Sequence, residues 1–441
     1  MPLILPSNSI SAGGYEVANS LRFNSGSSDY LSRTYGTPTN NLKYTKSFWV
    51  KRSALTDIGK GFIWCSSTNS NTDFFYFNAS DQIVLGNVIT PNTATAVFRD
   101  VSAWYHCVMV FDSANATADD RLILYVNGIR QTLSSTISLN STGGNQSGVT
   151  YTIANQGGIG RYLDGYLAEI CMIDGQALDP TSFGEFDADT GIWKPIDVSG
   201  LTFGNNGYYL PFENSGALGQ DDSGNGNNFT VNNLTSIDQV TDTPTNNFCT
   251  LNPLSKGSAL SLSNGNLTCT NDSTWRSVMS TIAVSKGKWY WEAKVVSLGT
   301  INFGVTKSKQ DGTTHSSVDA GRVMYSSNGY IYDEGFANSP IATGTTFTTN
   351  DIIGIALNLD AGTIGFYKNG SLVYTYSNAG LTTNEMTPAN GVNSATGDMN
   401  FGSPPFTIAS GNSDANGYGN FEYAVPSGYY ALCTKNLAEF G

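Results

Sequence analysis

The chain has 441 residues, including 48 glycines, 23 tyrosines and 22 phenylalanines, and only 13% of its residues are charged. This composition favours strands, turns and polar loops over helices, and no stretch approaches the ~18 apolar residues of a membrane-spanning helix. The formal net charge of −13 argues against a nucleic-acid partner, because a negative protein repels polyphosphate.

Residues 1–19 are predicted to form an N-terminal arm rather than part of a domain. They contain two prolines and the pair Gly13–Gly14, and they show no core-forming pattern. Such a segment is either a disordered tail or an extended arm that docks on a neighbouring molecule.

Residues 20–240 are predicted to form a first antiparallel β-sandwich. Apolar and aromatic runs recur every ~8–12 residues between turn signals, which is the spacing of a sandwich. Asn127–Gly128 separates two such runs and indicates a tight hairpin, because its turn needs positive φ at both central residues. Residues 208–213 are expected to return and close the sandwich. The other strand candidates are 47–52, 61–65, 73–77, 82–85, 104–111, 121–126 and 163–170.

Three segments of this domain resemble the laminin-G/concanavalin-A-like lectin fold: 104–111, 124–128 and 163–170. The resemblance implies a jelly roll, with Ala168 standing where the family usually has an acidic residue. The same fold hosts β-glucanases, whose carboxylates lie at i, i+2 and i+4 on one strand. The nearest pair here, Glu169 and Asp174, has the wrong spacing and would point to opposite faces. No catalytic residue is therefore assigned, and we do not expect an enzyme.

One tight loop near the end of this domain gathers hard oxygen ligands. Asp221, Asp222, Asn225 and Asn227 lie within it, and calcium prefers such carboxylate and amide oxygens. The alternative is a polar turn, since Asp, Gly and Asn also favour turn conformations. Calcium is the one cofactor that the sequence suggests, and both interpretations stay open.

His106 of the first domain and the cysteine side chains of the whole chain are expected to be packed rather than catalytic. His106 lies in an apolar strand beside Trp104. None of the cysteines forms a Cys-x-x-Cys pair, and several lie inside apolar strands, so we expect buried free thiols. The six cysteines are Cys65, Cys107, Cys171, Cys249, Cys269 and Cys433.

A linker at 241–255 is predicted to lead to a second antiparallel β-sandwich at 256–441. The clearest segment is 351–376, where Ile353, Ile355 and Leu357 alternate and Asn369–Gly370 marks a hairpin. This segment resembles the core of SPRY domains. The resemblance continues in order through four further segments: 287–292, 301–305, 324–332 and 399–402.

SPRY domains bind partners through loops at one end of the sandwich, so the resemblance directs attention to the 324–332 segment. Tyrosine and asparagine suit contact with sugars or peptides. Alternating tyrosines are also found in half-buried strands, and that alternative stays open. The candidate ligand-binding residues are Tyr325, Asn328, Tyr330, Tyr332 and Asp333.

The order of the two domains, together with the segments 20–23, 49–53 and 426–433, resembles lectin-like/SPRY proteins encoded by marine tailed bacteriophages. That resemblance implies a non-enzymatic virion structural protein, in a tail fibre or on the capsid, that mediates host attachment. Its partners would be other virion proteins and a host cell-surface glycan or protein, with a homo-oligomer as a further possibility. The alternatives are a glycan-degrading enzyme on the virion and a purely structural decoration protein without a host ligand.

Overall fold

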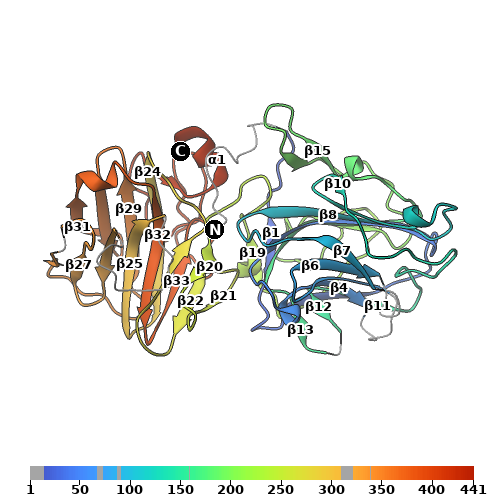
Figure 1. Ribbon diagram of the computed structural model, residues 1–441, viewed down its shortest axis with the longest axis horizontal. Coiled ribbons are helices and arrows are strands. Elements are labelled where there is room, and N and C mark those ends of the chain that lie inside the picture. The colour runs from blue at the N-terminus through green and yellow to red at the C-terminus, as the bar shows by residue number, and fades with distance from the viewer. Residues whose placement is uncertain (1–13, 67–72, 87–90, 158, 309–320, 338) are drawn as a thin grey trace. The chain divides into compact units, whose positions relative to one another are not determined.

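The computed structural model describes residues 14–66, 73–86, 91–157, 159–308, 321–337 and 339–441. The described residues divide between Thr245 and Asn246 into two compact units. Each unit is built from two antiparallel sheets that enclose an apolar core (Figure 1). The prediction of an all-β protein with two tandem antiparallel sandwiches is confirmed.

The first unit packs two sheets of orders β10-β9-β8-β3-β14-β1-β19 and β18-β2-β11-β4-β5-β6-β7, with β17 also paired to β14. The first sheet contains β1 (Ser20–Phe23), β3 (Lys43–Arg52), β8 (Trp104–Asp112), β9 (Leu122–Val126), β10 (Ile129–Arg130), β14 (Gly165–Asp174), β17 (Tyr208–Leu210) and β19 (Gln239–Val240). The second contains β2 (Tyr30–Thr34), β4 (Phe62–Ser66), β5 (Phe74–Phe77), β6 (Gln82–Gly86), β7 (Pro91–Val97), β11 (Thr150–Ile153) and β18 (Thr230–Asn232). Two short ribbons join β12 (Asn155–Gln156) to β13 (Arg161–Tyr162) and β15 (Gly184–Phe186) to β16 (Trp193–Pro195).

Strand alternation builds the core of this unit. Along β3, Tyr44, Phe48 and Val50 enter the core shared by the two sheets, as a period of two requires. The expected return of the chain is present, because β17 pairs with β14, β18 with β2 and β19 with β1. The segment after residue 200 thus completes both sheets.

The second unit packs two sheets of orders β20-β23-β32-β25-β26-β27-β28 and β21-β22-β33-β24-β29-β30-β31, with β34 also paired to β24. The first sheet contains β20 (Leu251–Lys256), β23 (Arg276–Ser280), β25 (Thr300–Lys307), β26 (Arg322–Ser326), β27 (Tyr330–Tyr332), β28 (Ile341–Ala342) and β32 (Met386–Asn393). The second contains β21 (Ser261–Ser263), β22 (Thr268–Asn271), β24 (Lys288–Ser297), β29 (Ile352–Asn358), β30 (Thr363–Lys368), β31 (Ser371–Ser377), β33 (Ala395–Asn400) and β34 (Tyr430–Ala431).

The predicted three-stranded segment is β29, β30 and β31, in consecutive antiparallel pairing. Ile353, Ile355 and Leu357 are fully buried, and Asn369 and Gly370 have φ of 48° and 79°, as the hairpin requires. Two features were not predicted. β34 runs parallel to β24, and a short helix, α1 (Thr434–Phe440), follows it. No helix in the described part of the chain has the length and apolar character needed to cross a membrane.

The structure differs from the predicted boundaries at both ends of the first domain. The predicted linker 241–255 is divided between the two units, and Asp242 and Leu251 within it are buried. Part of the predicted arm 1–19 belongs to the first unit, since Val17 is buried and its N–H donates to Thr245 Oγ1 at 3.1 Å. Residues 1–13 lie outside the described residues. The Thr- and Asn-rich stretch resembles a linker in composition, but its polar side chains form hydrogen bonds within each unit. Thr245 Oγ1 accepts from the Val17 N–H in the first unit, and Asn246 Oδ1 accepts from the Lys435 N–H in the second.

Candidate functional site

Part of the predicted ligand-binding set lies on one hairpin at an edge of the second unit. β26 turns at Gly329, where φ is 85°, and returns as β27, which pairs with the edge strand β28. Tyr330 and Tyr332 flank the buried Ile331 and therefore share the outer face of the sheet. Tyr330 is 41% exposed, and the two ring centroids are 6.4 Å apart. With Asn328 in the turn, these rings form what we call the tyrosine surface.

Hydrogen bonds hold the tyrosine surface in one arrangement. Asn328 Nδ2 donates to the Tyr332 hydroxyl at 2.9 Å, and Asn328 Oδ1 accepts from the Tyr330 N–H at 3.2 Å. The Thr343 N–H and hydroxyl both donate to the Gly329 carbonyl, at 2.9 and 2.8 Å. A ligand would meet groups that are already ordered, which lowers the entropic cost of binding.

The other two predicted residues do not reach this surface. Tyr325 is fully buried, its ring lies 4.9 Å from that of Phe347, and its hydroxyl donates to the Thr345 carbonyl. Asp333 is also buried and accepts hydrogen bonds from the Ser339 N–H and the Tyr376 hydroxyl. Both support the hairpin from below. Both follow the strand alternation, because residues 325, 331 and 333 face the core while 330 and 332 face outward.

The predicted calcium ligands do come together, but protein donors already use both oxygens of Asp221 and the side-chain oxygen of Asn227. Asp221 Oδ1 accepts from the N–H groups of Tyr209 and Ser223, and Asp221 Oδ2 accepts from the Ser223 hydroxyl and the Asn227 N–H. Asn227 Oδ1 accepts from the Arg33 guanidinium.

The remaining members of the loop continue the same pattern. Asn225 Nδ2 donates to the carbonyls of Gly204 and Gly207, and Asp222 Oδ1 accepts from Gln220 Nε2. Among the described residues no group of three or more His, Cys, Asp or Glu is placed to hold a metal. The arrangement therefore supports the polar-turn interpretation, with a cation, Arg33, already present.

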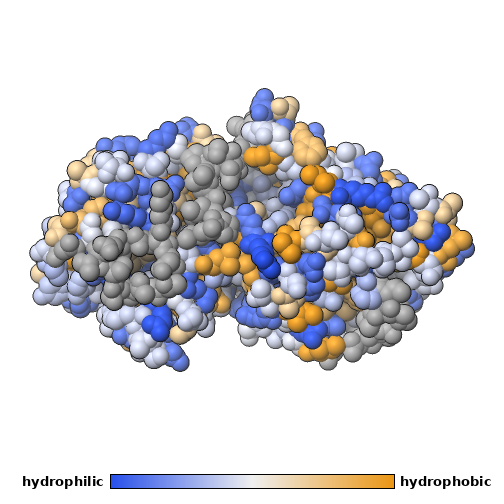
Figure 2. Space-filling view, viewed as in Figure 1, coloured by the Kyte–Doolittle hydropathy of each residue, from blue (hydrophilic) through white to orange (hydrophobic). Residues whose placement is uncertain are grey.

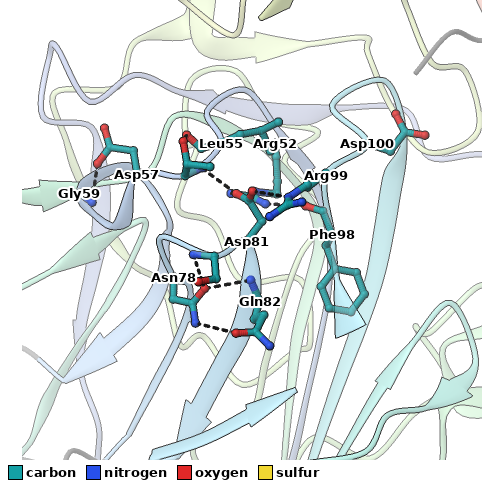
Figure 3. Close-up of polar contacts among 12 residues, drawn as sticks. Arg52, Leu55, Asp57, Gly59, Asn78, Asp81, Gln82, Phe98, Arg99 and Asp100 are labelled. Atoms are coloured by element: carbon teal, nitrogen blue, oxygen red, sulfur yellow. Dashed lines mark hydrogen bonds and ion pairs between the residues drawn. The ribbon is translucent and has the colours of Figure 1, made fainter. Parts of the chain in front are cut away.

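A buried charge cluster lies at the end of β3 and was not found from the sequence (Figure 3). Asp81, fully buried with φ of 61°, accepts from Arg52 at 3.0 Å and from Arg99 Nε at 2.9 Å. Its Oδ1 also accepts from the Thr56 N–H at 2.7 Å. Arg52 is buried over the Phe77 ring, whereas Arg99 is 57% exposed. Because 29 residues separate Arg52 from Asp81, no local spacing could have shown the pair.

His106 is packed as expected, and its hydrogen bonds disfavour a role as a general base for serine. Trp193 Nε1–H donates to His106 Nδ1 at 2.9 Å, so the ring proton lies on Nε2, 2.8 Å from Ser47 Oγ. The histidine thus donates to the serine, which is the reverse of a catalytic pair. Burial lowers the pKa of His106 to about 3, and its ring stacks on Trp49.

Glu169 is a buried carboxyl at a break in a strand. β14 carries a bulge at this point, and Glu169 has φ of 50°. Its Oε2 accepts from the hydroxyls of Tyr209 at 2.7 Å and Tyr15 at 3.0 Å, and the two hydroxyls are 2.9 Å apart. Burial, opposed by these hydrogen bonds, raises the pKa of Glu169 to about 7. Asp174 is bound separately, by backbone N–H groups of Thr39, Asn40 and Asn206.

The surface around these sites is mixed in polarity. On the face shown in Figure 2, apolar residues occur in small groups among polar ones. Over its described part, this face lacks an extended apolar patch of the kind that marks a large protein interface. Among the described residues, the exposed large apolar side chains are Val97, Ile129, Leu139, Ile159, Phe186, Leu254, Val296, Leu298, Tyr330 and Leu372.

Solved structures similar to part of this chain include the following three. The SPRY domain of human HERC1 is 19% identical, with 34% of this chain and 96% of that chain covered and a TM-score of 0.29. The TRIM65 PSpry domain is 15% identical, with 34% and 89% covered and a TM-score of 0.29. Stonustoxin is 20% identical, with 34% and 27% covered and a TM-score of 0.26. A search of curated proteins gave no match.

Two protein-family models match the sequence itself, in the order that the motifs predicted. The model described as "Concanavalin A-like lectin/glucanases superfamily" matches residues 25–181, and the model described as "SPRY domain" matches residues 288–404. Each match falls within one of the two sandwiches. The chain therefore carries a concanavalin A-like lectin/glucanases superfamily domain followed by a SPRY domain.

Proposed function

We propose that this protein is a non-enzymatic structural component of a tailed-bacteriophage virion that attaches the particle to the host surface. Lectin-like and SPRY domains both point to binding of carbohydrate or protein. The observation that carries the proposal is the tyrosine surface, where Tyr330, Tyr332 and Asn328 are presented on an ordered hairpin. Flat aromatic rings beside amide and hydroxyl groups suit either a sugar face or a peptide.

Attachment by this surface would be weak for one copy and firm for many. Two rings and one amide bury little area, so a single contact gives low affinity. Several copies on one particle raise the effective concentration of the remaining sites once one has bound. The virion location, with other virion proteins as partners, belongs to the same proposal.

A glycan-degrading enzyme has less support from the described residues. Glu169 and Asp174 bind separate sets of partners, and His106 donates to Ser47 rather than accepting from it. A decoration protein without a host ligand would leave the ordered tyrosine surface without a use. The decoration-protein alternative predicts unchanged adsorption in the experiment below.

The test combines particle composition with host adsorption. We expect mass spectrometry of purified virions to detect the chain, and Tyr330→Ala and Tyr332→Ala to lower adsorption several-fold while incorporation is unchanged. Tyr162→Ala is the matched control, because Tyr162 forms a similar half-buried pair with Tyr30, 6.1 Å between centroids, in the other domain. Absence of the chain from particles would overturn the virion role. Unchanged adsorption in both variants would exclude the tyrosine surface as the attachment site.

A further inference from the structure

A lysine and an aspartate contact each other in the centre of the first sandwich. Lys46 lies on β3, and Asp73 directly precedes β5 in the facing sheet. Their side chains are 2% and 3% exposed, and Lys46 Nζ contacts Asp73 Oδ2. The contact therefore bridges the two sheets through the core, between residues that are 27 positions apart.

The surroundings of this contact are aromatic. Lys46 Nζ lies 3.9 Å from the ring centroid of Trp64, 5.4 Å from that of Tyr44 and 5.5 Å from that of Tyr151. An ammonium group has three N–H donors, and among the described residues its recorded oxygen acceptor is Asp73 alone. A permanent ion pair is poorly solvated in such a place, because the lost hydration is replaced only in part.

The neighbouring loop fits closely around the carboxyl. A Cβ atom on Gly144 would overlap the Asp73 carboxylate, so only glycine leaves room for it. The Gly144 N–H donates to the Tyr44 hydroxyl at 2.9 Å, and the Tyr44 side chain lies close enough to Asp73 for each to influence the charge of the other.

Burial favours the neutral forms of both groups. It lowers the pKa of Lys46 and raises the pKa of Asp73, against the attraction between the two charges. Transfer of one proton from the ammonium to the carboxylate converts the ion pair into an amine and a carboxylic acid. These are a nucleophile and an electrophile in direct contact.

We propose that Lys46 and Asp73 condense into an intramolecular isopeptide bond that cross-links the two sheets of the first sandwich. Lys46 Nζ attacks Asp73 Cγ, and a C–N bond forms as one C–O bond breaks. The departing hydroxyl takes a proton from the amine and leaves as water. The neighbouring Tyr44 hydroxyl, which the Gly144 N–H holds in place, is a polar group that can stabilise the charge of the tetrahedral intermediate. No oxidant, reductant or cofactor is required, and the fixed contact supplies the high effective concentration that such a step needs.

The mass of the intact chain tests this proposal directly. After prolonged incubation at neutral pH, the purified full-length protein is expected to be lighter than its sequence by one water molecule. Protease digestion should then give a branched peptide joining residues 46 and 73. A full-length mass equal to that of the sequence, with Lys46 and Asp73 recovered in separate peptides, would overturn the proposal without any variant.

Variants separate this bond from other causes of a mass loss. Lys46→Arg keeps the positive charge but removes the amine nucleophile, so the full mass should return. Lys51→Arg is the matched control, because Lys51 forms another buried ion pair, with Asp242 at 2.7 Å. Asp242 also accepts a hydrogen bond from Trp104 Nε1. Loss of the mass deficit in Lys51→Arg, with its persistence in Lys46→Arg, would place the bond elsewhere. Tyr44→Phe should slow formation of the branched peptide.

Discussion

Glu169 combines a left-handed backbone conformation with a buried carboxyl between two tyrosines. Glu169 Oε2 and the two tyrosine hydroxyls all contact one another, which makes three oxygen–oxygen contacts. When Glu169 is ionised, only the two hydroxyl protons are available for these three contacts, and protonation of the carboxyl supplies a third proton. This arrangement agrees with the raised pKa of about 7 against an ordinary 4.5. The folded state therefore holds a proton that the unfolded state releases at lower pH. The stabilisation is complete below about pH 4.5 and is lost as the pH rises through 7.

We expect Glu169→Gln to remove this pH dependence. The difference in unfolding free energy between wild type and variant should change by on the order of 3 kcal/mol from pH 4.5 to pH 7.5, in the direction that wild type weakens. Denaturant unfolding across this range measures it. Glu213→Gln, which changes an exposed carboxyl, should leave most of the slope in place. Parallel curves for wild type and Glu169→Gln would contradict the assignment.

The Asp81 cluster allows the buried and exposed members of one charge network to be compared. Asp81→Asn keeps a side chain that tolerates φ of 61° but leaves the buried Arg52 without its counter-charge. Unfolding free energy should fall by roughly 3–5 kcal/mol. Arg99→Ala removes an exposed partner of the same carboxylate and should cost less than about 1 kcal/mol. Equal losses measured by urea unfolding would show that burial does not set the energetics of this network.

At the level of the elements, strand alternation and turn residues predicted the features that depend on neighbouring residues in the sequence. The β29–β31 hairpins follow from alternation and from Asn369–Gly370, whose positive φ values are a property of the two residues themselves. The six cysteines are free and buried, as their place in apolar strands indicated. The order of the two domains followed from the resemblance to known families, and the matched family models agree with it.

Contacts between distant strands could not be predicted in this way. The bulge that places Glu169 beside Tyr209 depends on the pairing of β14 with β3 and β17. The Lys46–Asp73 contact exists because two sheets face each other. Of the five candidate ligand-binding residues, by contrast, Tyr325 and Asp333 are buried while Tyr330 is exposed. Strand alternation accounts for this difference, since residues 325, 331 and 333 face the core and 330 and 332 face outward.

At the scale of the whole molecule, each unit has a core of its own. The core of the second unit includes Leu251, and the Cys249 N–H donates to the Leu432 carbonyl at 3.0 Å. Phe248, also buried, packs with Phe421 and Cys433. Residues 246–255 thus supply part of the second core although their composition resembles a linker. Whether an isolated second domain folds should therefore depend on whether it includes residues 246–255.

We expect a fragment of residues 246–441 to fold alone and a fragment of residues 256–441 to fail. The shorter fragment loses the start of β20, its pairing with β23 and several buried apolar side chains, and removal of each such side chain costs about 2–5 kcal/mol. Those losses together approach the whole stability of a domain, about 5–15 kcal/mol. Circular dichroism with thermal unfolding distinguishes a cooperative transition from none. The first unit offers a matched comparison of fragments 14–245 and 14–240. The shorter fragment lacks Asp242, the partner of the buried Lys51, and should be less stable than the longer one. Cooperative unfolding of 256–441 at the same temperature as 246–441 would show that residues 246–255 are a linker after all.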